Sequence, residues 1–269
     1  MRVGALNLPP VCCTSMGDIH FIAEDRGTGV LLVSFHGAVS RTESPLRPRY
    51  GYHSELRGRG ESYIAVSDPT LNLDDRITLG WYVGTEDRDV HVEIADVVRL
   101  EAISMGASRV VLIGSSGGGF AAMAVAAKLP GSAVVAISPS LEVNRVTPAH
   151  TSNFLAAAFP AYSSYEDLRA AHPTRVSMDA AYATHPDVNL FLIQNSGDES
   201  RMNGSYKPFI RDHAGHGCYR FALEHHGDGH VAPPPERFHY WLDQACSVAQ
   251  VLQVDPDIRR RRLQRQISA

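Results

Sequence analysis

Strongly apolar stretches alternate along this chain with stretches of helical period. Seven short apolar runs are rich in β-branched residues and end at turn residues, which predicts strands. The runs at residues 30–35 and 110–113 are continuously apolar, as is typical of parallel strands that helices cover on both faces. The seven predicted strands are residues 18–23, 30–35, 63–66, 110–113, 133–137, 190–193 and 219–223.

Three longer segments have the pattern of helices that pack on a sheet. Residues 90–105 carry apolar side chains on one helical face. Residues 120–128 are rich in alanine and stop at a Pro-Gly pair, while residues 234–251 begin with prolines suited to a first helical turn. Strands and helices that alternate in this way predict an α/β fold, with a mostly parallel central sheet flanked by helices.

The length of 269 residues fits a single α/β domain spanning residues 1–269. Two segments depart from the alternation: a long loop at 67–89, and residues 139–187, which hold only helical fragments. Because long insertions in compact folds are usually functional, we expect 139–187 to form a small cap. The arginine-rich stretch at about 253–269 is expected to be a solvated basic tail.

Composition excludes several classes of protein. Apolar residues make up 44% of the chain, enough for a packed core, and the net charge of −4 offers no broad basic face for nucleic acid. No run approaches the roughly 18 apolar residues of a membrane span, and the N-terminus lacks the apolar segment of a signal peptide. The four cysteines form no CxxC pair. These features predict a cytoplasmic protein in a reducing compartment.

The strongest chemical signal is Gly114-Ser115-Ser116-Gly117-Gly118, which fits the pattern G-x-S-x-G. It follows a predicted buried strand and precedes a predicted helix. A serine exposed on so sharp a turn needs small neighbours two residues away on each side, and glycines occupy both places. The pattern predicts that Ser116 is a nucleophile and that the Gly117 N–H, at the positive end of the helix, is an oxyanion-hole donor.

A nucleophile of this kind needs an acid and then a histidine, each after a later strand. Asp198 follows the sixth predicted strand, with Glu199 as the competing acid. His230 lies in a glycine-containing loop before the last helix, with His225 and His226 as competitors. We expect Asp198 to orient His230, and His230 to take the serine proton as general base.

The second oxyanion-hole donor is expected in the loop that follows the strand at 30–35. The residues there are His36-Gly37-Ala38. The Ala38 N–H is the preferred donor and the Gly37 N–H the alternative, while His36 is expected to brace the loop.

Two residues of the segment 67–89 are candidates for substrate binding. Topology brings Asp68, at the end of a predicted strand, and Trp81 near the sheet edge that carries the serine. A carboxylate beside an aromatic ring could bind a sugar or a polar acyl partner. A turn aspartate and a packed tryptophan form the alternative interpretation.

With these motifs in this order, the chain resembles the α/β-hydrolase family over residues 18–252. The resemblance implies a sheet of about eight strands, a nucleophile elbow in its middle, and a cap between the sixth and seventh strands, where residues 139–187 lie. The stretch GSSGGGFAA at residues 114–122 is also similar to elbows in hydrolase-like proteins linked to bacterial glycan acylation, including those of accessory secretion systems.

Two other readings of the motifs fit less well. Gly114, Gly117 and Gly119 give G-x-x-G-x-G, the wrong order for the dinucleotide-binding pattern G-x-G-x-x-G. His213 and His216 have helical spacing, but the sequence indicates no third metal ligand, and residues 211–217 read as a solvated turn. We therefore expect neither a cofactor nor a metal.

The sequence thus predicts a serine hydrolase of the carboxylesterase or thioesterase type. Ser116 would attack an ester or thioester of a small molecule or a glycan, and water would release the acyl-enzyme. Two alternatives stay open. One is an acyltransferase that passes the acyl group to a sugar or another hydroxyl acceptor. The other is a catalytically silent hydrolase-like scaffold that binds a partner or a glycan.

Overall fold

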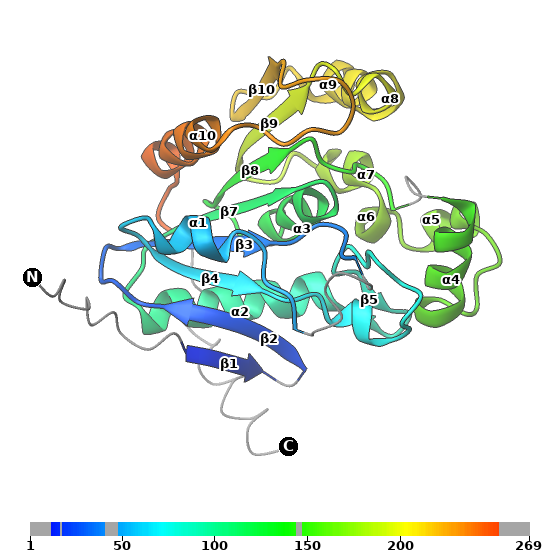
Figure 1. The fold of residues 1–269 in the computed structure, drawn as a ribbon, viewed down its shortest axis with the longest axis horizontal. Coiled ribbons are helices and arrows are strands. Elements are labelled where there is room, and N and C mark those ends of the chain that lie inside the picture. The colour runs from blue at the N-terminus through cyan, green and yellow to red at the C-terminus, as the bar shows by residue number, and fades with distance from the viewer. Residues whose placement is uncertain (1–11, 17, 41–47, 144–146, 253–269) are drawn as a thin grey trace, which may run out of the picture.

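The computed structural model describes residues 12–16, 18–40, 48–143 and 147–252. The basic tail expected at about 253–269 lies outside these ranges. The main sheet has eight strands, in the spatial order β1-β2-β4-β3-β7-β8-β9-β10 (Figure 1). These are β1 (Cys12–Met16), β2 (Ile19–Glu24), β3 (Val30–Phe35), β4 (Ser62–Val66), β7 (Arg109–Ser115), β8 (Ala133–Ile137), β9 (Asn189–Asn195) and β10 (Tyr219–Glu224).

The sheet is mostly parallel, as the sequence predicts. Strands β4, β3, β7, β8, β9 and β10 run parallel to one another, while β2 pairs antiparallel with both β4 and β1. All seven predicted strands are present, and β1 is an additional edge strand. A second, two-stranded sheet joins β5 (Gly84–Thr85) to β6 (Arg88–Asp89) in the segment expected to be a long loop.

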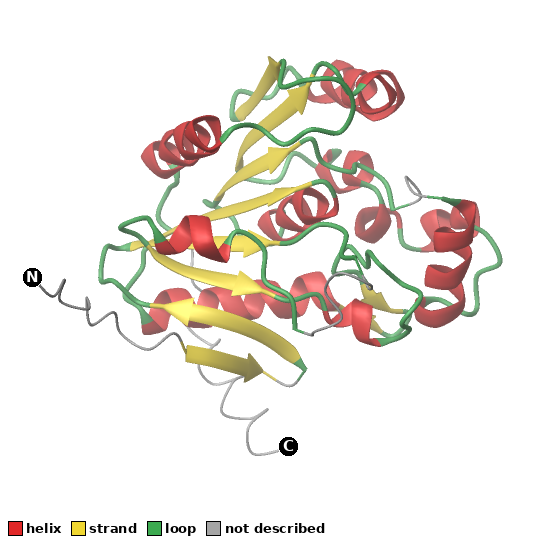
Figure 2. Cartoon of the chain, viewed as in Figure 1, coloured by secondary structure: helices red, strands yellow, loops and turns green. Residues whose placement is uncertain are grey.

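Helices cover both faces of the main sheet (Figure 2). Alternate residues of the strands β2 to β4 and β7 to β10 pack into two separate apolar clusters, as the two-residue period of a strand requires. One cluster joins the sheet to α2 (Val90–Ser104) and α3 (Gly117–Ala126). The other joins it to α1 (His53–Arg57) and α10 (Pro235–Val248). Among the described residues, no helix has the length and apolar character needed to cross a membrane.

The expected insertion lies between β8 and β9, beyond the carboxyl ends of the parallel strands (Figure 1). Its described residues form four short helices: α4 (Pro148–Ala158), α5 (Tyr165–Ala171), α6 (Pro173–Val176) and α7 (Met178–Tyr182). These strands are the sixth and seventh of the main sheet, the place that the resemblance implies for a cap.

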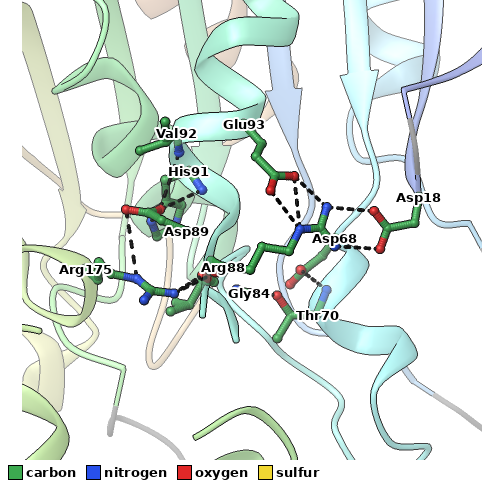
Figure 3. Close-up of polar contacts among 11 residues, drawn as sticks. Asp18, Asp68, Thr70, Gly84, Arg88, Asp89, His91, Val92, Glu93 and Arg175 are labelled. Atoms are coloured by element: carbon green, nitrogen blue, oxygen red, sulfur yellow. Dashed lines mark hydrogen bonds and ion pairs between the residues drawn. The ribbon is translucent and has the colours of Figure 1, made fainter. Parts of the chain in front are cut away.

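Arg175 of α6 ties the insertion to the segment that precedes α2 (Figure 3). Its Nη2 donates to the carbonyl oxygens of Val83, Thr85 and Arg88 at 2.8 Å each. Its Nε lies 3.9 Å from Oδ2 of Asp89, the N-cap of α2. Because the guanidinium is buried, these contacts fix the insertion against the domain.

The segment between β9 and β10 corrects one expectation. It holds the short helix α8 (Glu199–Arg201), the π-helical turn η2 (Met202–Tyr206) and the helix α9 (Lys207–His213). Residues 211–213, expected in a solvated turn, therefore close a helix, and His213 is buried. The sequence does not predict this helical segment because Gly204 and Pro208 both disfavour a helix interior.

Candidate active site

Ser116 forms the sharp turn between β7 and α3. Its backbone has φ 54° and ψ −122°, a region that non-glycine residues avoid at a cost of about 1–3 kcal/mol. A Cβ on Gly114 would collide with the backbone of Gly118, and one on Gly118 would lie 2.8 Å from the carbonyl oxygen of His36. The two glycines therefore permit the close backbone approach that holds Ser116 in this conformation.

The loop after β3 lies directly against this turn. A Cβ on Gly37 would lie 3.6 Å from Cβ of Ser116 and 4.0 Å from the backbone nitrogen of Gly117, the first residue of α3. Ala38 follows and is exposed. All three expected oxyanion-hole residues thus come from the two segments that meet at Ser116.

His36 holds the loop after β3 in place. Its Nε2 accepts the Asp68 N–H at 3.3 Å, so its Nδ1 carries the hydrogen and donates to the Gly37 carbonyl at 2.7 Å. Its own N–H donates to the Tyr82 hydroxyl at 2.9 Å. Because the carbonyl and N–H of a trans peptide point in opposite directions, the bond to Gly37 turns the Ala38 N–H away from His36.

Asp198 and His230 meet beyond the carboxyl ends of β9 and β10. Oδ2 of the buried Asp198 lies 2.9 Å from Nδ1 of His230, and its Oδ1 accepts the Arg201 N–H at the start of α8. Asn195, at the end of β9, holds the loop that carries His230. Its Nδ2 donates to the carbonyls of Gly227 and Gly229 at 2.8 Å each. The imidazole itself is 43% exposed.

The competing residues lie in other surroundings. Glu199 is exposed next to Asp198. His225 contacts the Ser196 hydroxyl at 3.1 Å, and His226 lies 3.0 Å from Oε2 of Glu224. Of the acids and histidines proposed from the sequence, Asp198 and His230 are the two that contact each other.

Arg201 is a site residue that the sequence does not suggest. Its Nη2 donates to Oγ of Ser116 at 3.3 Å, its Nη1 donates to Oγ of Ser140 at 3.2 Å, and its Nε lies 3.3 Å from Oδ2 of Asp198. Across the described residues, no hydrogen bond joins Ser116 to His230. The one sequence signal that could have indicated Arg201 is its spacing, three residues after Asp198 in a helical turn.

Burial and Arg201 together set the protonation of His230. Burial of the ring lowers its pKa below the ordinary value, and the positive charge of Arg201 lowers it further. Asp198 opposes both through its hydrogen bond and its charge. The imidazole is therefore neutral at neutral pH, the state that a general base needs.

Asp68 and Trp81, the residues considered for substrate binding, are both buried. Asp68 is 2% exposed, and its carboxylate accepts the Thr70 N–H at 2.9 Å (Figure 3) and the Tyr82 N–H at 3.0 Å. Burial raises the pKa of Asp68 to about 6. Trp81 is 0% exposed and packs edge-on against Phe154 of α4. These surroundings give both residues a role in shaping the loop and provide no surface for a substrate.

The histidines considered as metal ligands pair with other protein groups. Nε2 of His213 lies 3.0 Å from Oδ1 of Asp179, and the ring of His216 stacks on that of His185. In the part of the chain that the structure describes, no group of three or more His, Cys, Asp or Glu side chains is arranged to hold a metal ion.

The order of the strands, the central turn after β7 and the flanking helices define the α/β-hydrolase fold, and similar solved structures have this fold. One is the capsule O-acetyltransferase of Neisseria meningitidis serogroup A, with a TM-score of 0.67 and 14% identity over 88% of this chain and 95% of that chain. Another is an S-formylglutathione hydrolase from Agrobacterium tumefaciens, with a TM-score of 0.52 and 15% identity over 88% and 92% of the two chains.

A third similar structure is the glycosylation-associated protein (Gap123) complex from Streptococcus agalactiae, with a TM-score of 0.57 and 14% identity over 84% of this chain and 43% of that chain. No family model and no curated protein matches the sequence. At these identities the comparisons establish the fold, and the predicted α/β-hydrolase resemblance is confirmed at that level.

Proposed function

We propose that this protein is a serine hydrolase that cleaves an ester or thioester through an acyl-enzyme on Ser116. The observation that carries the proposal is the strained backbone of Ser116, at φ 54°, on the turn between β7 and α3. Strain of this kind persists where it serves a function, since a glycine would relieve it. The Asp198–His230 pair at the same edge of the sheet supports it.

The contacts support specific roles in acylation. Nδ1 of His230 donates to Asp198, which leaves Nε2 as the base. Nε2 takes the Ser116 hydroxyl proton while Oγ forms a bond to the carbonyl carbon. The resulting oxyanion would be held by the N–H groups of Gly117 and Ala38. When the bond to the leaving oxygen or sulfur breaks, the imidazolium returns the proton to that atom.

Deacylation repeats these steps with water. Nε2 of His230 takes a proton from water, the hydroxide forms a bond to the acyl carbon, and the bond to Oγ of Ser116 breaks as Oγ regains the proton. The carboxylic acid is then released. In both half-reactions His230 must bring Nε2 to Oγ of Ser116, and the exposed ring on its glycine-containing loop has room to do so.

Acyl transfer is the second candidate, and the likeness to a capsule O-acetyltransferase favours it. Its acyl-enzyme would form in the same way, and a sugar hydroxyl would take the place of water. The helices α4 and α5, beyond the carboxyl ends of the strands, would then limit the access of water to the acyl-enzyme.

The test is labelling by a fluorophosphonate, read by intact-protein mass spectrometry. We expect one adduct on the wild type, none on Ser116→Ala, and the full adduct on the matched control Ser115→Ala. Acyl esters and thioesters, with and without sugar acceptors, then separate hydrolysis from transfer by the product formed. A folded protein that is not labelled and cleaves none of these esters would overturn the proposal in favour of the binding scaffold.

A further inference from the structure

The nucleophile is in contact with a cation, which a Ser–His–Asp arrangement does not require. Nη1 and Nη2 of Arg201 donate to the hydroxyls of Ser140 and Ser116, at 3.2 and 3.3 Å. Its side chain is only 18% exposed, so the guanidinium points into the site instead of into solvent. The chemistry proposed for the triad leaves this residue without a role.

The two contacts of Arg201 with serine hydroxyls are weak ones for a guanidinium. Its two outer nitrogens meet neutral hydroxyls, whereas a guanidinium forms its strongest contacts as a fork on a carboxylate or a phosphate. Its Nε shares the carboxylate of Asp198 with His230, and the hydrogen bond to His230 is the shorter, 2.9 Å against 3.3 Å. An anionic group would therefore be a better partner for the fork than the two serines.

The charges of the site lead to the same conclusion. At rest, the negative charge of Asp198 is balanced by Arg201, since His230 is neutral. When His230 takes the serine proton, the Asp198 carboxylate and the new oxyanion balance the two cations. With a neutral substrate the site therefore carries one positive charge more than a triad without an arginine. A substrate with one negative charge would bring the site to the net charge that a triad without arginine has with a neutral substrate.

We propose that Arg201 is a specificity-determining residue that binds an anionic group, a carboxylate, phosphate or sulfate, which the substrate carries close to the scissile carbonyl. Nη1 and Nη2 exchange the hydroxyls of Ser140 and Ser116 for two oxygens of that group. The same contact places the carbonyl carbon near Oγ of Ser116. This inference rests on the proposed function, because it assigns the substrate class of the same site.

Three chromogenic esters test it. 4-Nitrophenyl acetate is neutral, mono-4-nitrophenyl succinate carries a carboxylate on the acyl side, and 3-carboxy-4-nitrophenyl acetate carries one on the alcohol side. The quantity to measure is the ratio of kcat/KM for each anionic ester to kcat/KM for the neutral one. A ratio cancels any general effect of a variant on the reactivity of Ser116.

Arg201→Met and Arg201→Lys are the test variants, and Arg211→Met is the matched control. Arg211 lies on α9, its side chain is 74% exposed, and it pairs with Asp212 at the surface. The wild type should prefer one of the two anionic esters. That preference should fall by about tenfold to a hundredfold in Arg201→Met, mainly through KM, since a hydrogen bond to a charged group is lost. Arg201→Lys should keep part of the preference because it keeps the charge, and Arg211→Met should keep all of it.

Each outcome bears on one of the two proposals. If Ser116→Ala abolishes cleavage but Arg201→Met leaves both ratios unchanged, the role of Arg201 is wrong and the serine hydrolase stands. If the wild type cleaves no ester, the proposed function fails and the inference fails with it. If Arg201→Met shows no thermal unfolding transition and so does not fold, Arg201→Lys provides the test. This variant keeps the charge but lacks the two parallel donors, so an unchanged kcat/KM ratio in it would also contradict the proposal.

Discussion

Nδ1 of His230 lies 2.9 Å from Oδ2 of Asp198, although the two residues are 32 positions apart in the chain. The distance follows from the sheet. Strands β9 and β10 pair in parallel with Asn195 opposite Glu224, so the loops that carry the two side chains leave the sheet side by side. The Gly229 N–H then donates to the Gly197 carbonyl at 2.8 Å and joins the loops. Neighbouring parallel strands thus bring distant residues to one edge.

The first prediction concerns the close approach of backbones beneath Ser116. Gly118→Ala should destabilise the protein by at least about 1–3 kcal/mol, since its Cβ would collide with the backbone of Phe35 and His36, which cannot move without disturbing the sheet. Gly60→Ala is the matched control, because a Cβ there meets nothing within 4 Å. Urea unfolding measures both. Equal midpoints would show that the elbow is not tightly packed.

Ser116 itself should be replaceable at no cost in stability. Ser116→Ala keeps the strained backbone and should leave the unfolding free energy within about 0.5 kcal/mol of wild type, because the half-buried hydroxyl adds little packing and accepts a long hydrogen bond of 3.3 Å from Arg201. Ser116→Gly should be more stable than Ser116→Ala by about 1 kcal/mol, since glycine adopts φ 54° without strain. Both should lose esterase activity. A glycine variant less stable than the alanine variant would argue against stored strain at this turn.

The parallel strands were predictable because burial on both faces requires continuous apolar runs. The sharp turn at Ser116 was predictable because glycines flank it between an apolar strand and a helix. The edge strand β1 was not predictable, since its residues Cys12-Cys13-Thr14-Ser15-Met16 show no alternation of apolar and polar side chains. The start of α3 at Gly117, three residues before the predicted start, reflects close packing that overrides the poor helix propensity of glycine.

Arg201 was missed for a related reason. It lies in the segment from α8 to α9, which reads as irregular because Gly204 and Pro208 interrupt it. Its spacing of three residues from Asp198 indicates a contact only where a helical turn is predicted, and none is predicted here. Its approach to Ser116 depends on the turn that Asp198 caps, and such local geometry is not encoded in composition or period. The burial of Asp68 and Trp81 agrees with the alternative interpretation of a turn aspartate and a packed tryptophan.

The contacts of Arg175 predict a large loss of stability when it is removed. Arg175→Met should destabilise the protein by about 2–4 kcal/mol, because the carbonyls of Val83, Thr85 and Arg88 would lose a charged donor in a buried place. Arg169→Met is the control, since Arg169 is 47% exposed and its ion pair with Glu142 is worth little. Thermal unfolding compares the two. Similar losses in both variants would mean that Arg175 does not anchor the insertion.

The pKa of His230 predicts the pH dependence of the reaction. The base must be neutral, so kcat/KM for a neutral ester should fall as the pH drops through the pKa of His230. Because burial and Arg201 both lower that pKa, the midpoint should lie below the ordinary value of about 6.5.

Arg201→Met removes one of these two effects and should move the midpoint to higher pH, while Asp198→Asn removes the opposing charge and should move it to lower pH. The matched control Arg211→Met, which removes the same charge from the surface, should leave the midpoint in place. A midpoint that shifts equally in Arg201→Met and Arg211→Met would reflect net charge alone. A midpoint that moves in neither variant would show that the charge of Arg201 does not affect the pKa of the general base.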